Sequence, residues 1–334
     1  MPANSDDNLF REHNDLREMF RLRDVVADLD PGAPPMARLV SAPRGGPPER
    51  LTVLAGSFNP PTNAHVALAR AAGRAARRPA VYFLLSRVTV DKERASGALL
   101  EDRLLLLERY AVHHSGLGVL LVNRGLYVEQ AEAIHRAFPD SGGLYFIVGF
   151  DKILQVFDPR YYADRDAALH QLFSLAAFLV TPRGGADWAE LAALLARPEN
   201  RPFRERVTLL PFPRRFAAFS STQVREALAA GPGKAGHLVA KLAPAEVVAF
   251  VAATRAYQPA ERLQHGEIID RYAVRAALIA LLDRERPWSE EEVDFPRLLR
   301  RAWSNTAAGR ELRDLLRHPP AAVRARLQGA RCPH

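Results

Sequence analysis

The chain has 334 residues, enough for about two average domains, and 48% of them are hydrophobic while 25% are charged, which excludes a disordered chain. A single cysteine, Cys332, excludes a disulfide-stapled fold, and no apolar run approaches the ~20 residues that cross a bilayer. The net charge is +8, but the arginines are scattered and do not argue for a nucleic-acid partner. The polar, acidic N-terminus is no signal peptide. We therefore expect a cytoplasmic protein with no membrane partner.

Residues 1–30 have an amphipathic pattern, in which apolar side chains such as Leu9, Leu16 and Phe20 recur among charged ones. This pattern predicts a helix. Residues 30–50 are rich in proline and glycine, which interrupt helices and central strands. We therefore expect residues 1–50 to form an N-terminal arm followed by a linker.

Alternation of strands and helices starts at Leu51. Short apolar runs predict buried strands at 51–55, 80–86, 117–122, 144–149, 178–181 and 207–210, and the run Leu172–Val180 also fits a core strand. Helical spacing predicts helices at 63–77, 98–113, 127–138, 221–230 and 244–256. This order implies an α/β fold, Rossmann-like, with a mostly parallel sheet and helices on both faces. Ligands of such sheets bind at the carboxyl ends of strands, where the strand order reverses.

Residues 258–334 show no strand signals and predict a small C-terminal helical appendage. Gly266–Asp283 is apolar-periodic, and Ser289-x-x-Glu292 is a candidate capping box. Apolar residues around Leu298, Trp303 and Leu315 predict two more helices.

The most informative segment follows the first expected strand and reads GSFNPPTNAH, from Gly56 to His65. Glycine at the strand exit lets a ligand approach the backbone. Thr62 and His65 are three apart at a helix start, so both can face one point where the helix dipole favours an anion. A histidine there can donate a hydrogen bond to a phosphoryl oxygen. His65 alone would more often be a satisfied core histidine, but the whole string favours a phosphate site.

Two later segments carry compatible chemistry. FSSTQVR, residues 219–225, has three hydroxyl residues at a helix start, and Arg225 lies one turn further on, where it can reach the same anion. An ordinary capped helix is the alternative. After the fourth strand, Gly149 leaves room for a nucleoside against the backbone, and Asp151 follows it, where a helix N-cap is an equally good explanation.

Together these segments resemble the nucleotidylyltransferase superfamily, and most closely nicotinamide-nucleotide adenylyltransferases of the eukaryotic and fungal type. The resemblance covers about residues 51–257, which we take as a nucleotidylyltransferase domain. Two positions depart from the common pattern: Thr62 stands where many bacterial members have the first histidine, and Ala64 replaces a glycine.

The resemblance implies transfer of AMP from ATP to the 5′-phosphate of a pyridine mononucleotide, with nicotinamide mononucleotide favoured, to form NAD and pyrophosphate. A phosphate monoester is mostly ionised near pH 7, so the attacking oxygen needs no general base. Positioning and charge stabilisation then supply the rate. Mg²⁺ is expected on the triphosphate, held largely by substrate oxygens and water rather than by protein ligands.

The resemblance also implies a role for each site residue. Catalytic roles fall to His65, Arg225 and Lys92. ATP-binding roles fall to Gly56, Phe58, Thr62, His65, Gly149, Asp151, Ser221, Thr222 and Arg225. Mononucleotide-binding roles fall to Ser57, Lys92 and the stacking candidates Tyr161 and Tyr162. Family members often have an arginine after the fifth strand, where this chain has Arg183.

Several alternatives stay open at this point. The acceptor could be nicotinate mononucleotide, phosphopantetheine or another phosphate ester, and the donor could be CTP. A class I aminoacyl-tRNA synthetase is disfavoured, because the chain has no Lys-Met-Ser-Lys-Ser-type loop. Outside the enzymes, the alternatives are a non-catalytic nucleotide sensor and a binding module whose partner docks on the appendage. A homo-oligomer is also left open.

Overall fold

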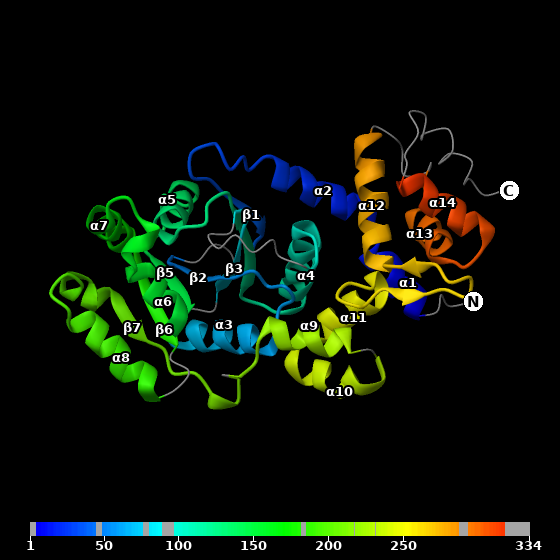
Figure 1. The fold of residues 1–334 in the computed structure, drawn as a ribbon. Helices are drawn as coiled ribbons and strands as arrows, with labels where there is room; N and C mark the ends of the chain where they lie inside the picture. The colour runs from blue at the N-terminus through cyan, green and yellow to red at the C-terminus, as the bar shows by residue number, and fades with distance from the viewer. Residues whose placement is uncertain are drawn as a thin grey trace.

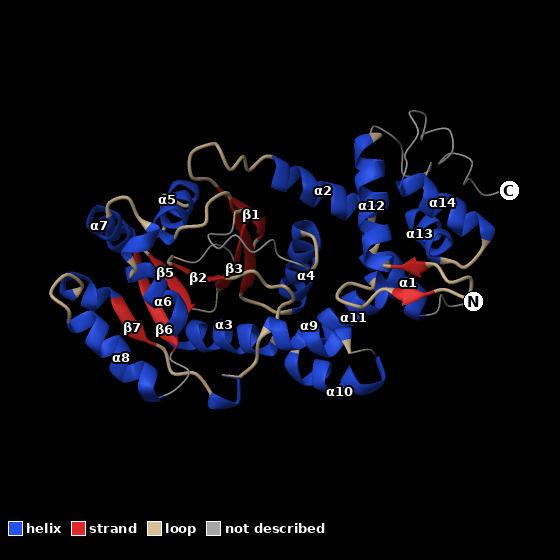
Figure 2. Cartoon of the chain, in the orientation of Figure 1, coloured by secondary structure: helices blue, strands red, loops and turns tan. Residues whose placement is uncertain are grey.

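The computed structural model describes residues 5–44, 49–75, 80–88, 97–181, 185–216, 218–230, 232–286 and 293–317. Within these ranges a seven-stranded sheet with the order β1-β4-β3-β2-β5-β6-β7 occupies the middle of the fold (Figure 2). The strands are β1 (Ala37–Ser41), β2 (Leu51–Ala55), β3 (Val81–Ser86), β4 (Leu117–Val122), β5 (Leu144–Gly149), β6 (Ala176–Thr181) and β7 (Val207–Leu209). All neighbouring strands are parallel except β1, which runs antiparallel to β4. The predicted α/β, Rossmann-like architecture is confirmed.

Helices cover both faces of the sheet. In β3 the side chains alternate, so that Val81, Phe83 and Leu85 join one buried cluster while Tyr82 and Leu84 join another. The first cluster includes residues of α3 and α4, and the second includes residues of α5 to α8. The helices in the first half of the chain are α1 (Ser5–His13), α2 (Leu16–Ala27), α3 (Asn63–Ala75), α4 (Leu100–His113), α5 (Tyr127–Ala137), α6 (Phe150–Phe157) and α7 (Arg165–Leu175). Those in the second half are α8 (Gly185–Ala196), α9 (Ser221–Ala229), α10 (Pro232–Leu242), α11 (Ala245–Thr254), α12 (Arg271–Arg284), α13 (Phe295–Trp303) and α14 (Ala307–Arg317).

The strand order reverses between β2 and β5. From β2 the chain adds β3 and then β4 on one side, and it returns to place β5, β6 and β7 on the other. β2 and β5 are hydrogen-bonded neighbours, and Leu54 pairs with Ile147 near the carboxyl ends of both strands. The residues that follow, from Gly56 and from Gly149, therefore start on either side of the reversal, which is where open α/β sheets bind ligands.

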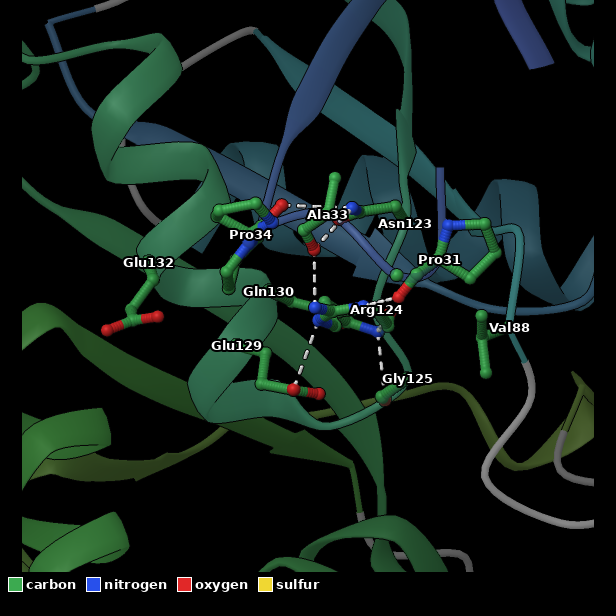
Figure 3. Close-up of polar contacts among 12 residues, drawn as sticks. Pro31, Ala33, Pro34, Val88, Asn123, Arg124, Gly125, Glu129, Gln130 and Glu132 are labelled. Atoms are coloured by element: carbon green, nitrogen blue, oxygen red, sulfur yellow. Dashed lines mark hydrogen bonds and ion pairs between the residues drawn. The ribbon is translucent and has the colours of Figure 1, made fainter. Parts of the chain in front are cut away.

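The expectation of a linker over residues 30–50 is wrong, because Ala37–Ser41 forms edge strand β1. Figure 3 shows how the preceding turn is held against the end of β4. The Asn123 amide donates to the carbonyls of Asp30, at 2.7 Å, and Pro34, at 3.0 Å. Arg124 donates to carbonyls of the same turn and pairs with Glu129. Pro31, Pro34 and Pro35 precede β1 and Pro43 follows it, so their missing N–H groups cost the sheet no hydrogen bond.

Two further expectations need correction. The run Leu172–Val180 is not one strand: α7 ends at Leu175 and β6 begins at Ala176, because an apolar run does not by itself distinguish a buried helix end from a strand. The C-terminal segment contains a short antiparallel hairpin, β8 (Glu261–Arg262) and β9 (Ile268–Ile269), although it showed no strand signal. Its helices α12, α13 and α14 agree with the prediction, and the candidate capping box at 289–292 lies outside the described residues.

The N-terminal helices and the C-terminal helices lie together at one end of the molecule (Figure 1). One buried cluster contains Leu16 and Leu22 of α2, Leu104 of α4, Leu278 of α12 and Leu299 of α13. The predicted arm and appendage therefore share a core with helix α4, while the boundaries at residues 50 and 257 stay a prediction. In the part of the chain that the structure describes, none of the helices is long and apolar enough to span a membrane.

Candidate active site

A cavity of about 150 Å³ lies at the carboxyl ends of β2 and β5, where the strand order reverses. One wall comes from α3 and includes His65, and the floor comes from the strand ends and includes Gly149. Its full lining is Leu54, Ala55, Ala64, His65, Leu68, Tyr127, Ile147, Val148, Gly149, Lys152, Thr181, Phe212, Phe216 and Phe219.

The loop after β2 is folded around the Phe58 ring. Phe58 is fully buried, has a left-handed φ of 44°, and packs edge-on against His65 and Phe83 with ring centroids 5.1 Å away in each case. A Cβ atom on Gly56 would lie 3.1 Å from the Phe58 ring, so glycine gives that ring its room. Phe58 therefore has no surface exposed to the cavity, and its predicted ATP-binding role stays a prediction.

Thr62 and His65 cap helix α3 reciprocally. The Thr62 hydroxyl accepts from the His65 N–H at 3.4 Å, and His65 Nδ1 accepts from the Thr62 N–H at 3.0 Å. A backbone N–H can only donate, so Nδ1 is the unprotonated nitrogen, and in the neutral ring the proton lies on Nε2. Thr62 itself is fully buried. It therefore orients His65, and Nε2 is the atom that can donate to a ligand in the cavity.

The second motif begins helix α9 and is bound to the first. Ser220 and Gln223 form a capping box, which stabilises the helix start. Ser221 Oγ donates to the Pro60 carbonyl at 2.7 Å, and Arg225 donates to the Asn59 carbonyl at 2.7 Å. The imidazole-bearing and guanidinium-bearing segments, distant in sequence, thus meet at one loop.

Of the other predicted site residues, some line the cavity and others do not. Gly149 is the N-cap of α6 and lines the cavity, so the alternative reading of Asp151 as the N-cap is wrong. Asp151 is exposed in the first turn of α6, and Thr222 is exposed and accepts from Arg225 at 3.1 Å. Ser57 is exposed at the start of the loop. Asp151, Thr222 and Ser57 are not among the lining residues.

The two stacking candidates differ in their contacts, and neither lines the cavity. The Tyr162 hydroxyl donates to the Val156 carbonyl at 2.8 Å, and burial raises the pKa of Tyr162 to about 12. Tyr161 is partly exposed at the end of a short 3₁₀ turn. Lys92 and Arg183 both lie outside the described residues.

Sequence reasoning missed the aromatic wall of the cavity. Phe212, Phe216 and Phe219 come from the segment between β7 and α9 and pack in series, with centroids 5.9 Å and 5.5 Å apart. Tyr127 faces the same cavity, and burial raises its pKa well above the ordinary value. The sequence contains a signal for this wall, because three phenylalanines within eight residues of a segment without strand pattern indicate an apolar contact surface.

The cavity lining has few side chains that could bind a metal ion. Among the described residues, no three His, Cys, Asp or Glu side chains gather as a metal site requires. The cavity lining contains one histidine and no carboxylate. Its charged and polar lining suits an anion instead, because His65 and Lys152 both line it close to the N-termini of α3 and α6.

Comparison with known proteins supplies a family. A model of the family described as Cytidylyltransferase-like matches residues 53–227, just over half of the chain, and this range contains both motifs. No curated protein matches the chain significantly. Among solved structures, Plasmodium falciparum nicotinic acid mononucleotide adenylyltransferase complexed with NaAD is 15% identical with a TM-score of 0.45, over 62% of this chain and 97% of that one. The same protein complexed with APC is 13% identical with a TM-score of 0.42, over 62% and 96%.

Proposed function

This chain belongs to the cytidylyltransferase-like family and is a nucleotidylyltransferase, and from that premise we propose that it transfers AMP from ATP to the 5′-phosphate of a pyridine mononucleotide. Nicotinamide mononucleotide is the favoured acceptor, so the products are NAD and pyrophosphate. The observation that carries the proposal is the hydrogen bond from Arg225 to the Asn59 carbonyl, which joins the guanidinium segment to the loop that presents His65.

The proposed reaction is an in-line displacement at the α-phosphorus of ATP. An oxygen of the acceptor phosphate forms the new bond, and the bond to the bridging oxygen breaks, so that the electron pair leaves with pyrophosphate. The His65 Nε2–H donates to an α-phosphoryl oxygen, where negative charge develops. Arg225 and Thr222 hold the departing phosphates, and the N-termini of α3 and α9 add their partial positive charge.

The aromatic cavity supports a nucleoside as the bound group. A flat heterocycle can stack against Phe212 or Phe216, while the exposed Asp151 is free of the core and can meet ribose hydroxyls. Gly149 adds no side chain at the floor, and a Cβ atom there would meet no atom within 4 Å. We assign this cavity to the adenosine half of ATP and the side of Ser57 to the acceptor phosphate.

The triphosphate is expected to arrive as its Mg²⁺ complex, as part of the substrate. Mg²⁺ prefers carboxylate and phosphate oxygens, and the lining of this cavity has no carboxylate, so the proposal places the ion on the phosphates. Phosphate oxygens and water would then complete the coordination of the ion.

CTP as donor is the second candidate, because the family description is cytidylyltransferase-like. The two motifs handle phosphates and do not distinguish bases, so the choice falls to the aromatic wall. A purine offers more stacking surface to three phenylalanines than a pyrimidine does, which favours ATP.

A pyrophosphate-release screen tests the proposal. The purified full chain is given ATP or CTP with Mg²⁺, each with nicotinamide mononucleotide, nicotinate mononucleotide or phosphopantetheine. We expect the fastest release with ATP and nicotinamide mononucleotide. Faster release with nicotinate mononucleotide or phosphopantetheine would reassign the acceptor, faster release with CTP would reassign the donor, and nucleotide binding without release from any pair would make the protein a sensor.

A further inference from the structure

Helix α4 holds the loop after β2 from outside the cavity. The Ala98 N–H, just before α4, donates to Asn59 Oδ1 at 3.2 Å, and the Tyr257 hydroxyl donates to the same oxygen at 2.8 Å. Arg103, in the first turns of α4, donates to the Ser57 carbonyl at 2.9 Å. The loop is therefore fixed both through a buried side-chain amide and through its backbone.

The approach between this loop and the start of α4 is unusually close. Gly97 has a φ of +136°, and a Cβ atom there would lie 2.5 Å from Asn59 Oδ1. Only glycine combines that backbone conformation with that lack of space. The position of Asn59 is thus coupled to where α4 begins.

The same end of α4 is also bound by helix α12. The Tyr272 hydroxyl accepts from the Leu99 N–H at 2.7 Å and donates to Asp102 Oδ2 at 2.5 Å. Arg275, one turn along α12, donates to the same carboxylate oxygen at 2.7 Å. Asp102 and Arg275 are both fully buried, so this is an ion pair inside the core.

The ion pair also reaches the N-terminal helices. Arg275 Nε donates to Asn14 Oδ1 at 2.7 Å, and Arg275 donates to the His13 carbonyl at 3.3 Å. Asn14 in turn donates to the Ala253 carbonyl of α11 at 3.2 Å. Burying a charge pair between helices costs desolvation free energy that apolar packing does not. In return, the ion pair and its hydrogen bonds hold the helices in one defined geometry. Helix α12 thereby fixes the first turn of α4, and residues 13–14 and α11 in turn hold Arg275 and Asn14.

We propose that Tyr257 and Tyr272 are positioning residues for the transfer reaction, through which the chain after α11 holds Ser57–Asn59 in the geometry that Arg225 and His65 require. Tyr272 holds the start of α4, and Tyr257 together with Ala98 holds the Asn59 amide. The Asn59 carbonyl in turn accepts from Arg225. The catalytic role of this loop rests on the function proposed above, whereas its mechanical coupling to α12 does not.

Three tyrosine-to-phenylalanine variants of the full chain test the inference. Tyr257→Phe and Tyr272→Phe each remove one of the hydroxyls in this chain of contacts. Tyr110→Phe is the control: Tyr110 is a buried α4 tyrosine whose ring stacks on His114. For each variant, kcat, KM for ATP, thermal unfolding and hydrogen exchange of the peptide spanning 54–62 are measured.

We expect Tyr257→Phe and Tyr272→Phe to lower kcat roughly 10- to 100-fold, the scale of a small misplacement near the reacting groups. KM for ATP should change far less, and exchange in the 54–62 peptide should become faster than in the control. Unchanged kcat, or a loss that only follows the fraction of unfolded protein, would overturn the proposal. The exchange measurement needs no substrate: if the wild type releases no pyrophosphate, the proposed function fails, while faster exchange in both variants still supports the coupling and unchanged exchange rejects it.

Discussion

At the scale of single residues, His65 is the side chain on which the proposed chemistry depends most. Its Nδ1 is occupied by the Thr62 N–H, so the ring presents Nε2 to the cavity. We expect His65→Ala to lower kcat by orders of magnitude while ATP binding persists, because one imidazole donor stabilises charge that develops only in the transition state. Pre-steady-state turnover and equilibrium ATP binding measure the two effects. His135→Ala, on the exposed face of α5, is the control, and a His65→Ala enzyme with near-normal turnover would remove the histidine from its role.

Substitutions at Gly149 should affect ATP binding more than the free energy of unfolding. A Cβ atom there meets nothing within 4 Å, so Gly149→Ala should change the free energy of unfolding by about 1 kcal/mol or less. The added carbon enters the cavity, and Gly149→Leu fills much of it, so KM for ATP should rise in that order. Urea unfolding and steady-state kinetics give the two quantities. By contrast, Gly118→Ala should destabilise the fold, because its Cβ would lie 2.7 Å from the Tyr82 ring. Tight ATP binding by Gly149→Leu would place the nucleotide elsewhere.

The sequence predicts some residues of the site and misses others for a physical reason. Thr62, His65, Ser221 and Arg225 belong to two local motifs, and each motif sits at a helix start whose position follows from spacing. The burial of Phe58 does not follow from spacing, because it depends on Phe83 of strand β3. The partners of Asn59, far along the chain, are likewise set by tertiary packing that no local pattern records.

At the scale of elements, docking of α9 on the first motif depends on Arg225. Removing a charged donor from a carbonyl typically costs about 1.5–3 kcal/mol. We expect Arg225→Ala to lower the free energy of unfolding by about that amount and to raise KM for ATP more than it lowers kcat. Denaturant unfolding and ATP titration test both effects, with Glu226→Ala on the exposed side of the same helix as control. An unchanged affinity for ATP would contradict the proposed role in phosphate binding.

The C-terminal hairpin is joined to α14 by a pH-dependent contact. Glu267 accepts from Arg313 at 3.0 Å and pairs with Arg317 at 2.9 Å, and these bonds, chiefly that of Arg313, lower the Glu267 pKa to about 2 from an ordinary 4.5. A carboxylate with a depressed folded-state pKa stabilises the fold above the unfolded-state pKa, and this stability is lost as pH falls. Wild type should therefore unfold at a higher temperature than Glu267→Gln at pH 7, and the difference should shrink between pH 4.5 and about 2. A difference that stays constant over this range would contradict the assignment, and Glu311→Gln on α14 is the control.

The elements themselves were predictable to very different degrees. Strands β2 to β5 follow from short apolar runs in the sequence, which are typical of strands buried on both faces of a parallel sheet. β1 was missed because Ala37–Ser41 is an edge strand with exposed positions, flanked by prolines. α10 was missed because Gly233 and Gly236 lower its helix propensity, which tertiary packing overrides.

At the scale of the whole molecule, the Asp102–Arg275 pair connects the N-terminal helices and α12 to helix α4. Removing one partner of a buried pair leaves an uncompensated charge and costs about 3–5 kcal/mol. We expect Arg275→Ala to lower the free energy of unfolding by about that amount, measured by urea titration. The double variant Arg275→Ala with Asp102→Asn should recover part of the loss, because the stranded charge is gone. A double variant no more stable than Arg275→Ala alone would show that the loss comes from packing.

The placement of Arg275 near the end of the sequence has a consequence for synthesis. A chain leaving the ribosome completes α4, and with it Asp102, long before α12 emerges. Until then Asp102 has no guanidinium partner, so its carboxylate must stay hydrated and the core around it cannot close. Translation that stops short of α12 should therefore yield polypeptides that bind chaperones and are degraded, even though every strand of the sheet has already been made.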